Sequence, residues 1–211
     1  MKNLLYKEFH LVIHPLFYLV ILSGGLLMIP QWAYFIAMMY FFFITVLNIF
    51  SIGKAQNDIG FSAMLPVRRN DIVKARVVSV IILEVLQIVV TAVFAVINLS
   101  VYHFDNYLMN TNAAFIGFVF IMYALFNLAL FPMFYKTAYK IGIPIIVAMG
   151  VAVLFSAGVE FLTMIPPFTV LHGRQINAAQ IGVLAGGIVL FALINMAAYR
   201  LSVKRFESID L

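Results

Sequence analysis

The sequence predicts an all-α integral membrane protein with six transmembrane helices, and three observations lead to this fold class. Of the 211 residues, 65% are hydrophobic and only 10% are charged, whereas about 25% are charged in soluble domains. One crossing of the hydrocarbon takes about 20 apolar residues, so the chain has room for about six crossings. Its basic residues gather between alternate apolar segments. We therefore expect a single transmembrane domain over residues 1–211, with no separate soluble domain.

An amphipathic helix over residues 1–15 is expected to lie in the membrane interface. Lys7, His10 and His14 fall on one side of a helical wheel, and apolar residues fall on the other side. Pro15 then lets the chain turn into the membrane. The two histidines suit the headgroup level better than a metal site, because no third ligand is nearby.

Six apolar segments follow, separated by short turns and by one long polar interval, residues 53–76. Gly182 and Gly186 in the last segment have the small-xxx-small spacing that lets a neighbouring helix approach closely. The predicted spans are residues 16–29, 32–52, 77–101, 113–135, 141–165 and 178–199.

The distribution of Lys and Arg predicts the orientation. Twelve of the 13 basic residues lie in segments assigned to one side, and Arg174 alone lies on the other. By the positive-inside rule, both termini and residues 53–76 face the cytoplasm, and the chain is a multi-pass protein of the cell membrane. The net charge of +5 suits an anionic membrane surface better than nucleic acid. The twelve are Lys2, Lys7, Lys54, Arg68, Arg69, Lys74, Arg76, Lys136, Lys140, Arg200, Lys204 and Arg205.

The sequence contains no motif of a catalytic site. It has no P-loop pattern, no His-Glu-x-x-His and no Gly-x-Ser-x-Gly, and it has no cysteine to serve as a nucleophile or thiolate ligand. The four histidines divide between the two predicted membrane sides, so they cannot converge on one metal. We expect no catalysis, no metal and no cofactor bound by this chain itself.

Polar residues recur along one face of the predicted span 77–101. Glu84, Gln87, Thr91 and Asn98 have helical spacing, and a polar stripe is costly against lipid, so it should face other helices or a cavity. Two interpretations stay open: a lining for a translocation path, or hydrogen bonds that hold the bundle together. A different class of function, a secondary transporter with Glu84 as a proton or cation site, is the alternative. The candidate path residues are Asn48, Glu84, Gln87, Asn127 and Asn195.

The interval 53–76 divides into two parts. Asn57 or Asp58 can begin a short helix whose apolar side chains form a compact exposed knob, and Pro66 ends it. Such a knob is typical of a docking element, and a second interfacial helix lying on lipid is the alternative. After it, Arg68, Arg69 and Arg76 are expected to anchor the return into the membrane. The candidate docking residues are Asn57, Asp58, Ile59, Phe61, Ser62, Met64 and Leu65.

The segment Leu-Pro-Val-Arg-Arg-Asn-Asp-Ile-Val-Lys-Ala-Arg, residues 65–76, lies between the second and third predicted spans. It resembles the Leu-Pro-Val-[Ser/Thr]-Arg-x-[Asp/Glu]-Ile-Val-x-x-[Lys/Arg] segment of small ABC transporter permeases of the type-2 exporter class. Within that class the chain looks most like the permeases of staphylococcal phenol-soluble-modulin exporters. Arg68 departs from the pattern, because small hydroxyl residues are common at its position.

This resemblance implies one half of an ATP-driven exporter. Two permease chains, forming a homodimer or a heterodimer, would work with two copies of a separate ABC ATP-binding subunit, which holds the ATP and Mg. Residues 57–65 would be the coupling helix, and the N-terminal helix would brace it. Residues 161–177, with Glu160, Pro166 and Pro167, would form an outer gate; Glu160 taken alone suggests a hydrated interfacial carboxylate. The implied cargo is amphipathic or hydrophobic: peptides first, then lipids or drugs.

Overall fold

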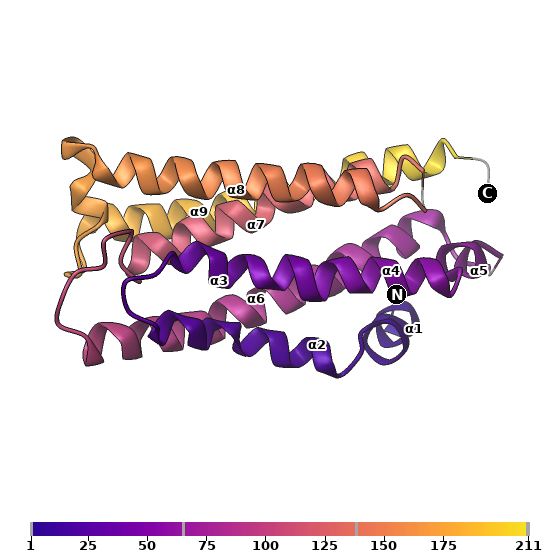
Figure 1. Cartoon of the computed structure of the whole chain (residues 1–211). Coiled ribbons are helices and arrows are strands. Elements are labelled where there is room, and N and C mark those ends of the chain that lie inside the picture. The colour runs from indigo at the N-terminus through magenta and orange to yellow at the C-terminus, as the bar shows by residue number, and fades with distance from the viewer. Residues whose placement is uncertain (1, 65, 138, 210–211) are drawn as a thin grey trace.

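The computed structural model describes residues 2–64, 66–137 and 139–209, and all regular elements among them are helices. The long helices run roughly along one axis (Figure 1). α7 packs against α8 and α9, while α6 packs against the early segment η2. The elements are α1 (Lys2–Lys7), η1 (Glu8–Val12), α2 (Leu16–Leu19), η2 (Val20–Met28), α3 (Tyr34–Tyr40), η3 (Phe41–Val46), α4 (Leu47–Ala55), α5 (Asp58–Met64), α6 (Arg69–Val101), α7 (Ala113–Phe134), α8 (Gly142–Met164), η4 (Pro166–Leu171) and α9 (Ala178–Glu207).

Five helices of the described chain are long and apolar enough to cross a membrane. The first of them is continuous through α3, the π-helical stretch η3 and α4. They coincide with the last five of the six predicted spans. The five are Tyr34–Ala55, Arg69–Val101, Ala113–Phe134, Gly142–Met164 and Ala178–Glu207.

The first predicted span, residues 16–29, is helical but shorter than these five. It consists of four α-helical residues in α2 and nine 3₁₀-helical residues in η2. A 3₁₀-helix rises about 2.0 Å per residue against about 1.5 Å in an α-helix, so the two pieces reach about 24 Å. A hydrocarbon core is about 30 Å thick. This segment is packed tightly on α6, since a Cβ on Gly24 would lie 2.9 Å from Thr91 Cα.

α6 and α9 extend beyond their predicted spans at the same end of the bundle. α6 has 33 residues and α9 has 30, which correspond to about 50 Å and 45 Å of helix, so both outreach a membrane core of about 30 Å. The Arg69 guanidinium donates to the Phe206 and Glu207 carbonyls at the end of α9, both at 3.4 Å, and to the Ile209 carbonyl just beyond it at 2.7 Å. Arg69 thus caps α9, a role that its predicted use as a lipid anchor did not include.

The closest approach of α7 and α9 uses a glycine pair. A Cβ on Gly117 would lie 2.5 Å from the Val183 carbonyl oxygen, and a Cβ on Gly187 would overlap the Gly117 backbone. Gly182 and Gly186, which the small-xxx-small spacing singled out, have no neighbour within 4 Å of such a Cβ. Within this chain, therefore, Gly182 and Gly186 do not make the predicted close contact, and the helix turns Gly187 toward α7 instead.

Candidate functional site

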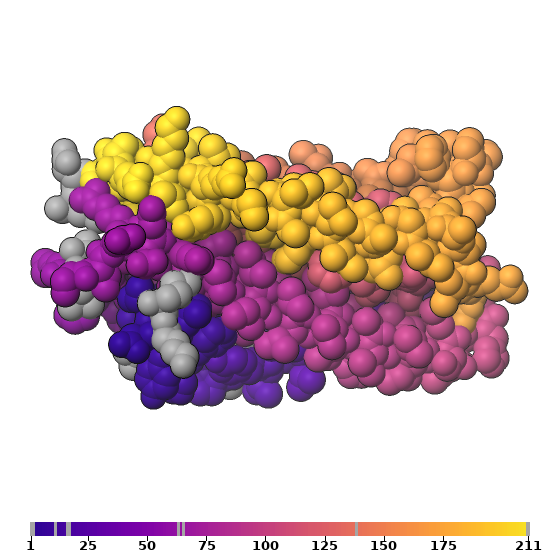
Figure 2. Space-filling view, turned by 180° about the vertical axis from the view of Figure 1, so that it is seen from behind, coloured from indigo at the N-terminus to yellow at the C-terminus, as the bar shows by residue number. Residues whose placement is uncertain are grey.

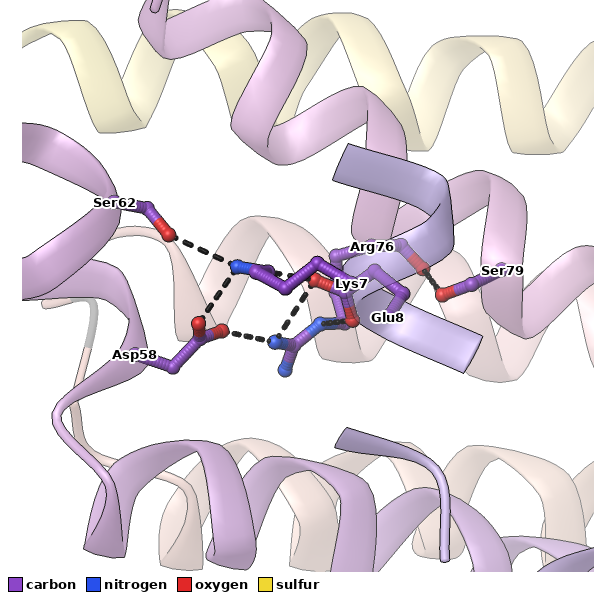
Figure 3. Close-up of polar contacts among 6 residues, drawn as sticks. All are labelled: Lys7, Glu8, Asp58, Ser62, Arg76 and Ser79. Carbon is purple, nitrogen blue, oxygen red and sulfur yellow. Dashed lines mark hydrogen bonds and ion pairs between the residues drawn. The ribbon is translucent and has the colours of Figure 1, made fainter. Parts of the chain in front are cut away.

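A cluster of ionic side chains lies at the end of the bundle where α1 and α5 meet α6 (Figures 1 and 3). Lys7 Nζ lies 2.6 Å from Asp58 Oδ1 and donates to Ser62 Oγ at 2.9 Å. Arg76 Nη2 lies 2.5 Å from Asp58 Oδ2, and Arg76 Nε lies 2.6 Å from Glu8 Oε2. The cluster therefore joins three segments that are far apart in the sequence: the N-terminal helices, α5 and α6.

The cluster is almost closed to solvent and carries no net charge. Glu8 is 2% exposed, Arg76 is 4% exposed and Asp58 is 9% exposed. Burying a charge is costly unless a partner of opposite charge accompanies it, and here two cations balance two carboxylates. The Arg76 guanidinium also lies over the Phe50 ring, 5.5 Å from its centroid. Gly53 makes room for it, because a Cβ there would lie 3.1 Å from Arg76 Nη1.

α5 has one face turned to the cluster and another face turned outward. The backbone enters α5 through Asn57 in the left-handed conformation, with φ of 49°, which asparagine tolerates better than most residues. Asp58 and Ser62, four residues apart, point inward and are buried. Phe61 and Met64 are 59% and 84% exposed on another side.

The predicted docking residues therefore divide between these two faces. Phe61 and Met64 are available to a partner, and Asn57 is exposed beside them. Ile59 packs against the core instead. Asp58 and Ser62 serve the ionic cluster and do not contribute to the outer surface. Leu65 lies outside the described residues.

Arg76 was expected to anchor the chain at the membrane surface, and that expectation is wrong. Its guanidinium is buried and holds two carboxylates from other segments. Arg68, by contrast, is exposed. The difference follows from helical geometry, because the first turns of α6 place position 76 toward α1 and α4.

A second polar group lies inside the bundle and connects α6, α7 and α9. Asn127 Nδ2 donates to Glu84 Oε2 at 2.8 Å and to Asn195 Oδ1 at 2.9 Å. Asn195 Nδ2 in turn donates to the Phe191 carbonyl at 2.9 Å, within its own helix. Glu84 and Asn127 are fully buried. Three of the five candidate path residues thus meet in one chain of hydrogen bonds.

The other two candidate path residues lie elsewhere. Gln87 Nε2 donates to Ser23 Oγ at 2.8 Å, and its Oε1 accepts from the Tyr123 hydroxyl at 2.6 Å, so it connects α6 with η2 and α7. Asn48 is half-buried, and its Nδ2 donates to the Ile44 carbonyl of its own helix at 2.6 Å. Asn48 therefore does not join the polar stripe.

At the opposite end of the molecule, side chains donate mainly to backbone carbonyls. Arg174 donates to the carbonyl oxygens of Phe104, Leu99 and Tyr102, at 2.6 Å for Phe104 and 2.7 Å for Leu99. These interactions tie residues 172–174 to the end of α6 and the loop that follows it. Leu99 is one of the last carbonyls of α6, where a cation is favourable.

Asparagines add to this connection. Asn112 caps α7 by accepting from Phe115 N at 3.0 Å, and its Nδ2 donates to the carbonyls of Leu171 and Gly173 at 2.7 and 2.8 Å. Asn110 Nδ2 donates to the His172 carbonyl at 2.8 Å. The loop of residues 102–112 and the segment 171–174 are therefore held together by several side chains.

The predicted gate residues border this region. Glu160 is half-buried, and its Oε2 accepts from the Met109 backbone N–H at 2.7 Å, so it is more than a hydrated carboxylate. Pro166 and Pro167 are exposed and begin η4, the 3₁₀ turn that follows α8. They change the chain direction at the predicted place.

A scan against protein-family models matches residues 3–207 to the family described as ABC-2 family transporter protein. This match covers nearly the whole chain. The chain belongs to the ABC-2 family. A search of curated proteins and a search of solved structures found no match. As an ABC-2 member, the chain is the membrane permease component of an ABC transporter, and ATP is bound by a separate subunit.

Several residues of the ABC-2 chain's polar clusters were not predicted as site residues, Glu8 and Arg174 among them. Glu8 looked like an interruption of the apolar N-terminal face, and its partner Arg76 lies 68 positions away. Arg174 was noticed only as a lone outer cation, and that isolation was the one available signal. Within residues 2–64, 66–137 and 139–209, no three His, Asp or Glu side chains are grouped as a metal site.

Proposed function

We propose that this ABC-2 chain is the permease half of an ATP-driven exporter in the cytoplasmic membrane, with six spans and both termini in the cytoplasm. The positive-inside distribution supports this orientation. So does the position of the N-terminal helix, α5 and the end of α9 at one end of the bundle (Figure 1). In this proposal α2 and η2 form the first of the six spans, in addition to the five long helices. The 3₁₀ geometry of η2 lets these thirteen residues reach most of the way across the hydrocarbon.

The observation that carries the proposal is the two-faced geometry of α5. Its outer face offers Phe61 and Met64, which are large, apolar and exposed, to a groove on the ATP-binding subunit. Its inner face is tied by Asp58 to Lys7 and to Arg76. A push on α5 is therefore passed directly to α6 and to the N-terminal helices, which makes α5 the coupling helix.

Two permease chains, identical or paired with a related one, complete the transporter, together with two ATP-binding subunits. α8 suits a contact with the second chain. Gly150 and Gly158 lie eight residues apart on this helix, and nothing lies within 4 Å of a Cβ built on either, so another helix can approach closely. Leu154, between them, is 75% exposed.

The cargo we propose is amphipathic or hydrophobic, with amphipathic peptides such as phenol-soluble modulins first. The exposed surfaces of the long helices are apolar and rich in Ile, Val and Leu, and they would tolerate such cargo. The buried amides of Gln87, Asn127 and Asn195 already have hydrogen-bond partners inside the bundle. We therefore place Glu84, Gln87 and Asn127 in the bundle as interhelical ties, and assign the moving path to surfaces between two chains.

The test asks whether this chain binds the ATP-binding subunit and stimulates its ATPase activity. The full chain is co-expressed with a candidate ABC ATP-binding subunit, purified in mild detergent, and reconstituted into vesicles for ATPase and fluorescent-peptide transport assays. Phe61→Asp and Met64→Asp should each abolish co-purification and ATP-driven transport. Met164→Asp is the matched control, because Met164 is 57% exposed at the opposite end of the molecule. It should leave the association intact.

Two outcomes would contradict the proposal. One is unchanged co-purification of Phe61→Asp and Met64→Asp. The other is vesicle transport that persists without the ATPase and collapses with the proton gradient, which would favour a secondary transporter. Glu84→Gln addresses that case directly, because glutamine keeps the size and the acceptor that Asn127 uses. We expect this variant to transport normally, whereas a proton-carrying Glu84 would make it inactive.

A further inference from the structure

A groove of about 510 Å³ lies between α6 and α9, on the face where the two helices run side by side (Figure 2). Its walls are mostly apolar, and its residues come from only these two helices. It is distinct from the ionic cluster and from the exposed face of α5. The lining residues are Lys74, Val77, Val78 and Ile81 of α6 and Phe191, Ala192, Asn195, Met196, Tyr199 and Arg200 of α9.

The polar groups of the groove are gathered at one end. Lys74 and Arg200 are exposed there, and Tyr199 lies beside Arg200. Among the described residues neither cation has a carboxylate partner, since the ion pairs found all belong to the cluster of Lys7, Glu8, Asp58 and Arg76. Asn195 lies deeper, but its amide is already bonded to Asn127 and Phe191. The mouth is therefore cationic and the interior is apolar.

The length of the groove matches one leaflet. From Arg200 to Phe191 is nine residues of α-helix, or about 14 Å along the axis, and half of a hydrocarbon core is about 15 Å. The mouth lies toward the end of the bundle where Arg69 caps α9. In the orientation proposed above, this is the cytoplasmic side. Tyrosine beside two cations is the composition found at a membrane interface.

We propose that this groove is a binding site for an anionic phospholipid of the inner leaflet. The phosphate lies between Lys74 and Arg200, and one acyl chain lies along Val78, Ile81, Ala192 and Met196. A net-negative headgroup is favoured over a zwitterionic one because the two cations have no carboxylate to balance them. The inference rests on the proposed orientation and requires neither coupling nor transport.

A second copy of the chain fits this groove less well. A two-fold axis normal to the membrane would bring a patch against itself at the same depth. Lys74 and Arg200 would then face the same cations of the other copy, without an intervening anion. Like charges at such a contact repel, whereas a lipid phosphate supplies the missing charge.

The experiment uses the full chain in nanodiscs and needs no ATP-binding subunit. Retention of phosphatidylglycerol and of phosphatidylcholine with the same acyl chains is compared by native mass spectrometry. We expect retention of phosphatidylglycerol to fall about tenfold or more in the Lys74→Gln/Arg200→Gln double variant, because it removes the two side chains that would contact the phosphate, and a direct hydrogen bond to a charged group contributes about tenfold. The matched control is Lys54→Gln/Arg68→Gln, which removes the same charges from exposed positions outside the groove.

A second experiment locates the acyl chain of the bound lipid. Phosphatidylglycerol with a mid-chain diazirine should label the segments 77–81 and 191–196, and Ala192→Trp should abolish this labelling by filling the groove. Because the chain contains no cysteine, Ala192→Cys provides a single thiol. Efficient disulfide formation between two Ala192→Cys chains would show that a second copy occupies the groove and would overturn the proposal.

Two further results would also overturn it: equal retention of the two lipids, or equal losses in the groove variant and in the control. Both are distinguishable from failure of the proposed function. That failure would show as normal lipid retention together with unchanged co-purification of Phe61→Asp. Monodisperse elution of each variant confirms that it is folded.

Discussion

The two ends of this permease differ in their ion pairs: among the described residues, ion pairs are found at the α5 end, although Arg69 and Arg205 there also donate to backbone carbonyls. At the α5 end, Lys7 and Arg76 pair with Glu8 and Asp58, so charged side chains bind charged side chains. At the other end, Arg174 and the asparagines donate mostly to carbonyl oxygens of the backbone. The first arrangement joins side chains of separate helices. The second holds the main chain itself in one place.

This difference bears on how motion could pass through the molecule. Removing one member of a buried charge pair leaves the other buried and unpaired, so displacement of α5 is strongly coupled to α6 and to the N-terminal helices. Backbone carbonyls at the opposite end tolerate less rearrangement, because several must move together to release Arg174. We therefore expect the α5 end to transmit displacement and the opposite end to resist it.

The largest expected effect comes from Arg76→Met, which leaves Glu8 and Asp58 buried with only Lys7 to balance them. Loss of one partner of a buried pair costs about 3–5 kcal/mol, so the free energy of unfolding in detergent should fall by about that amount. Adding Glu8→Gln to the variant should recover part of the loss. Arg68→Met is the control at an exposed position. A loss no larger than that of the control would refute the charge-paired description of this end.

The next effect is at the opposite end, where Arg174→Lys keeps the charge and loses the planar fork of donors. One ammonium group cannot serve the carbonyls of Leu99, Tyr102 and Phe104 in the same way, so we expect a loss of about 2 kcal/mol. Hydrogen exchange should rise in residues 102–112. Arg68→Lys is the control at an exposed position, and it should leave the stability unchanged. Unchanged exchange in that loop would mean that Arg174 does not hold it.

Variants of Asn112, at the same end, distinguish its role as the N-cap of α7 from its hydrogen bonds to residues 171 and 173. Asn112→Ser keeps an acceptor for Phe115 N but is too short to donate to both Leu171 and Gly173, and should cost about 1 kcal/mol. Asn112→Ala loses the cap as well, which adds about 1 kcal/mol. Thermal unfolding of the two variants in the same detergent measures the difference. Equal melting temperatures would show that the cap contributes nothing.

The smallest effect is expected from Lys7→Gln, because the Lys7 side chain is 15% exposed and Arg76 still pairs with Asp58. After allowance for solvent screening we expect a loss of about 0.5–1 kcal/mol. The loss of stability in Lys7→Gln should be smaller in 1 M salt, because salt screens the ion pair. The loss in Arg174→Lys should not change with salt, because it comes from hydrogen-bond geometry. Unfolding at low and high salt tests the contrast, with Lys54→Gln as the exposed control. A salt-independent loss in Lys7→Gln would remove the distinction between the two ends.

Much of the fold could be predicted because hydropathy and charge act locally along the chain. The transfer of apolar segments into lipid depends on their own composition, and this indicated the five long helices. Composition did not predict the 3₁₀ form of Val20–Met28. In this segment Gly24 packs tightly against Thr91 of α6. Likewise, spacing alone favoured Gly182 and Gly186, while contact with Gly117 selected Gly187.

The candidate site was only partly predictable. Helical periodicity indicated correctly that Glu84, Gln87 and Thr91 would share a face, because their spacing is a property of one helix. The capping residues Asn57 and Asp58 and the helix-ending Pro66 indicated α5, and Phe61 and Met64 were among its predicted apolar residues. Periodicity could not say that Asp58 and Ser62 would turn inward, because that depends on where Lys7 and Arg76 lie.

The sequence by itself determined that this protein is helical and crosses a membrane, and its motif and whole-chain pattern indicated the ABC-2 class. Helical structure and membrane insertion follow from composition and periodicity, whereas the ABC-2 class was indicated by the resemblance of residues 65–76 and of the whole chain to that family. The tertiary structure alone decided which charges are buried and with which partners. Lys7 meets Asp58 across 51 positions, and Arg174 meets Phe104 across 70. Such pairs form because packing removes water from both groups at once, and no property of either residue's own segment specifies the other.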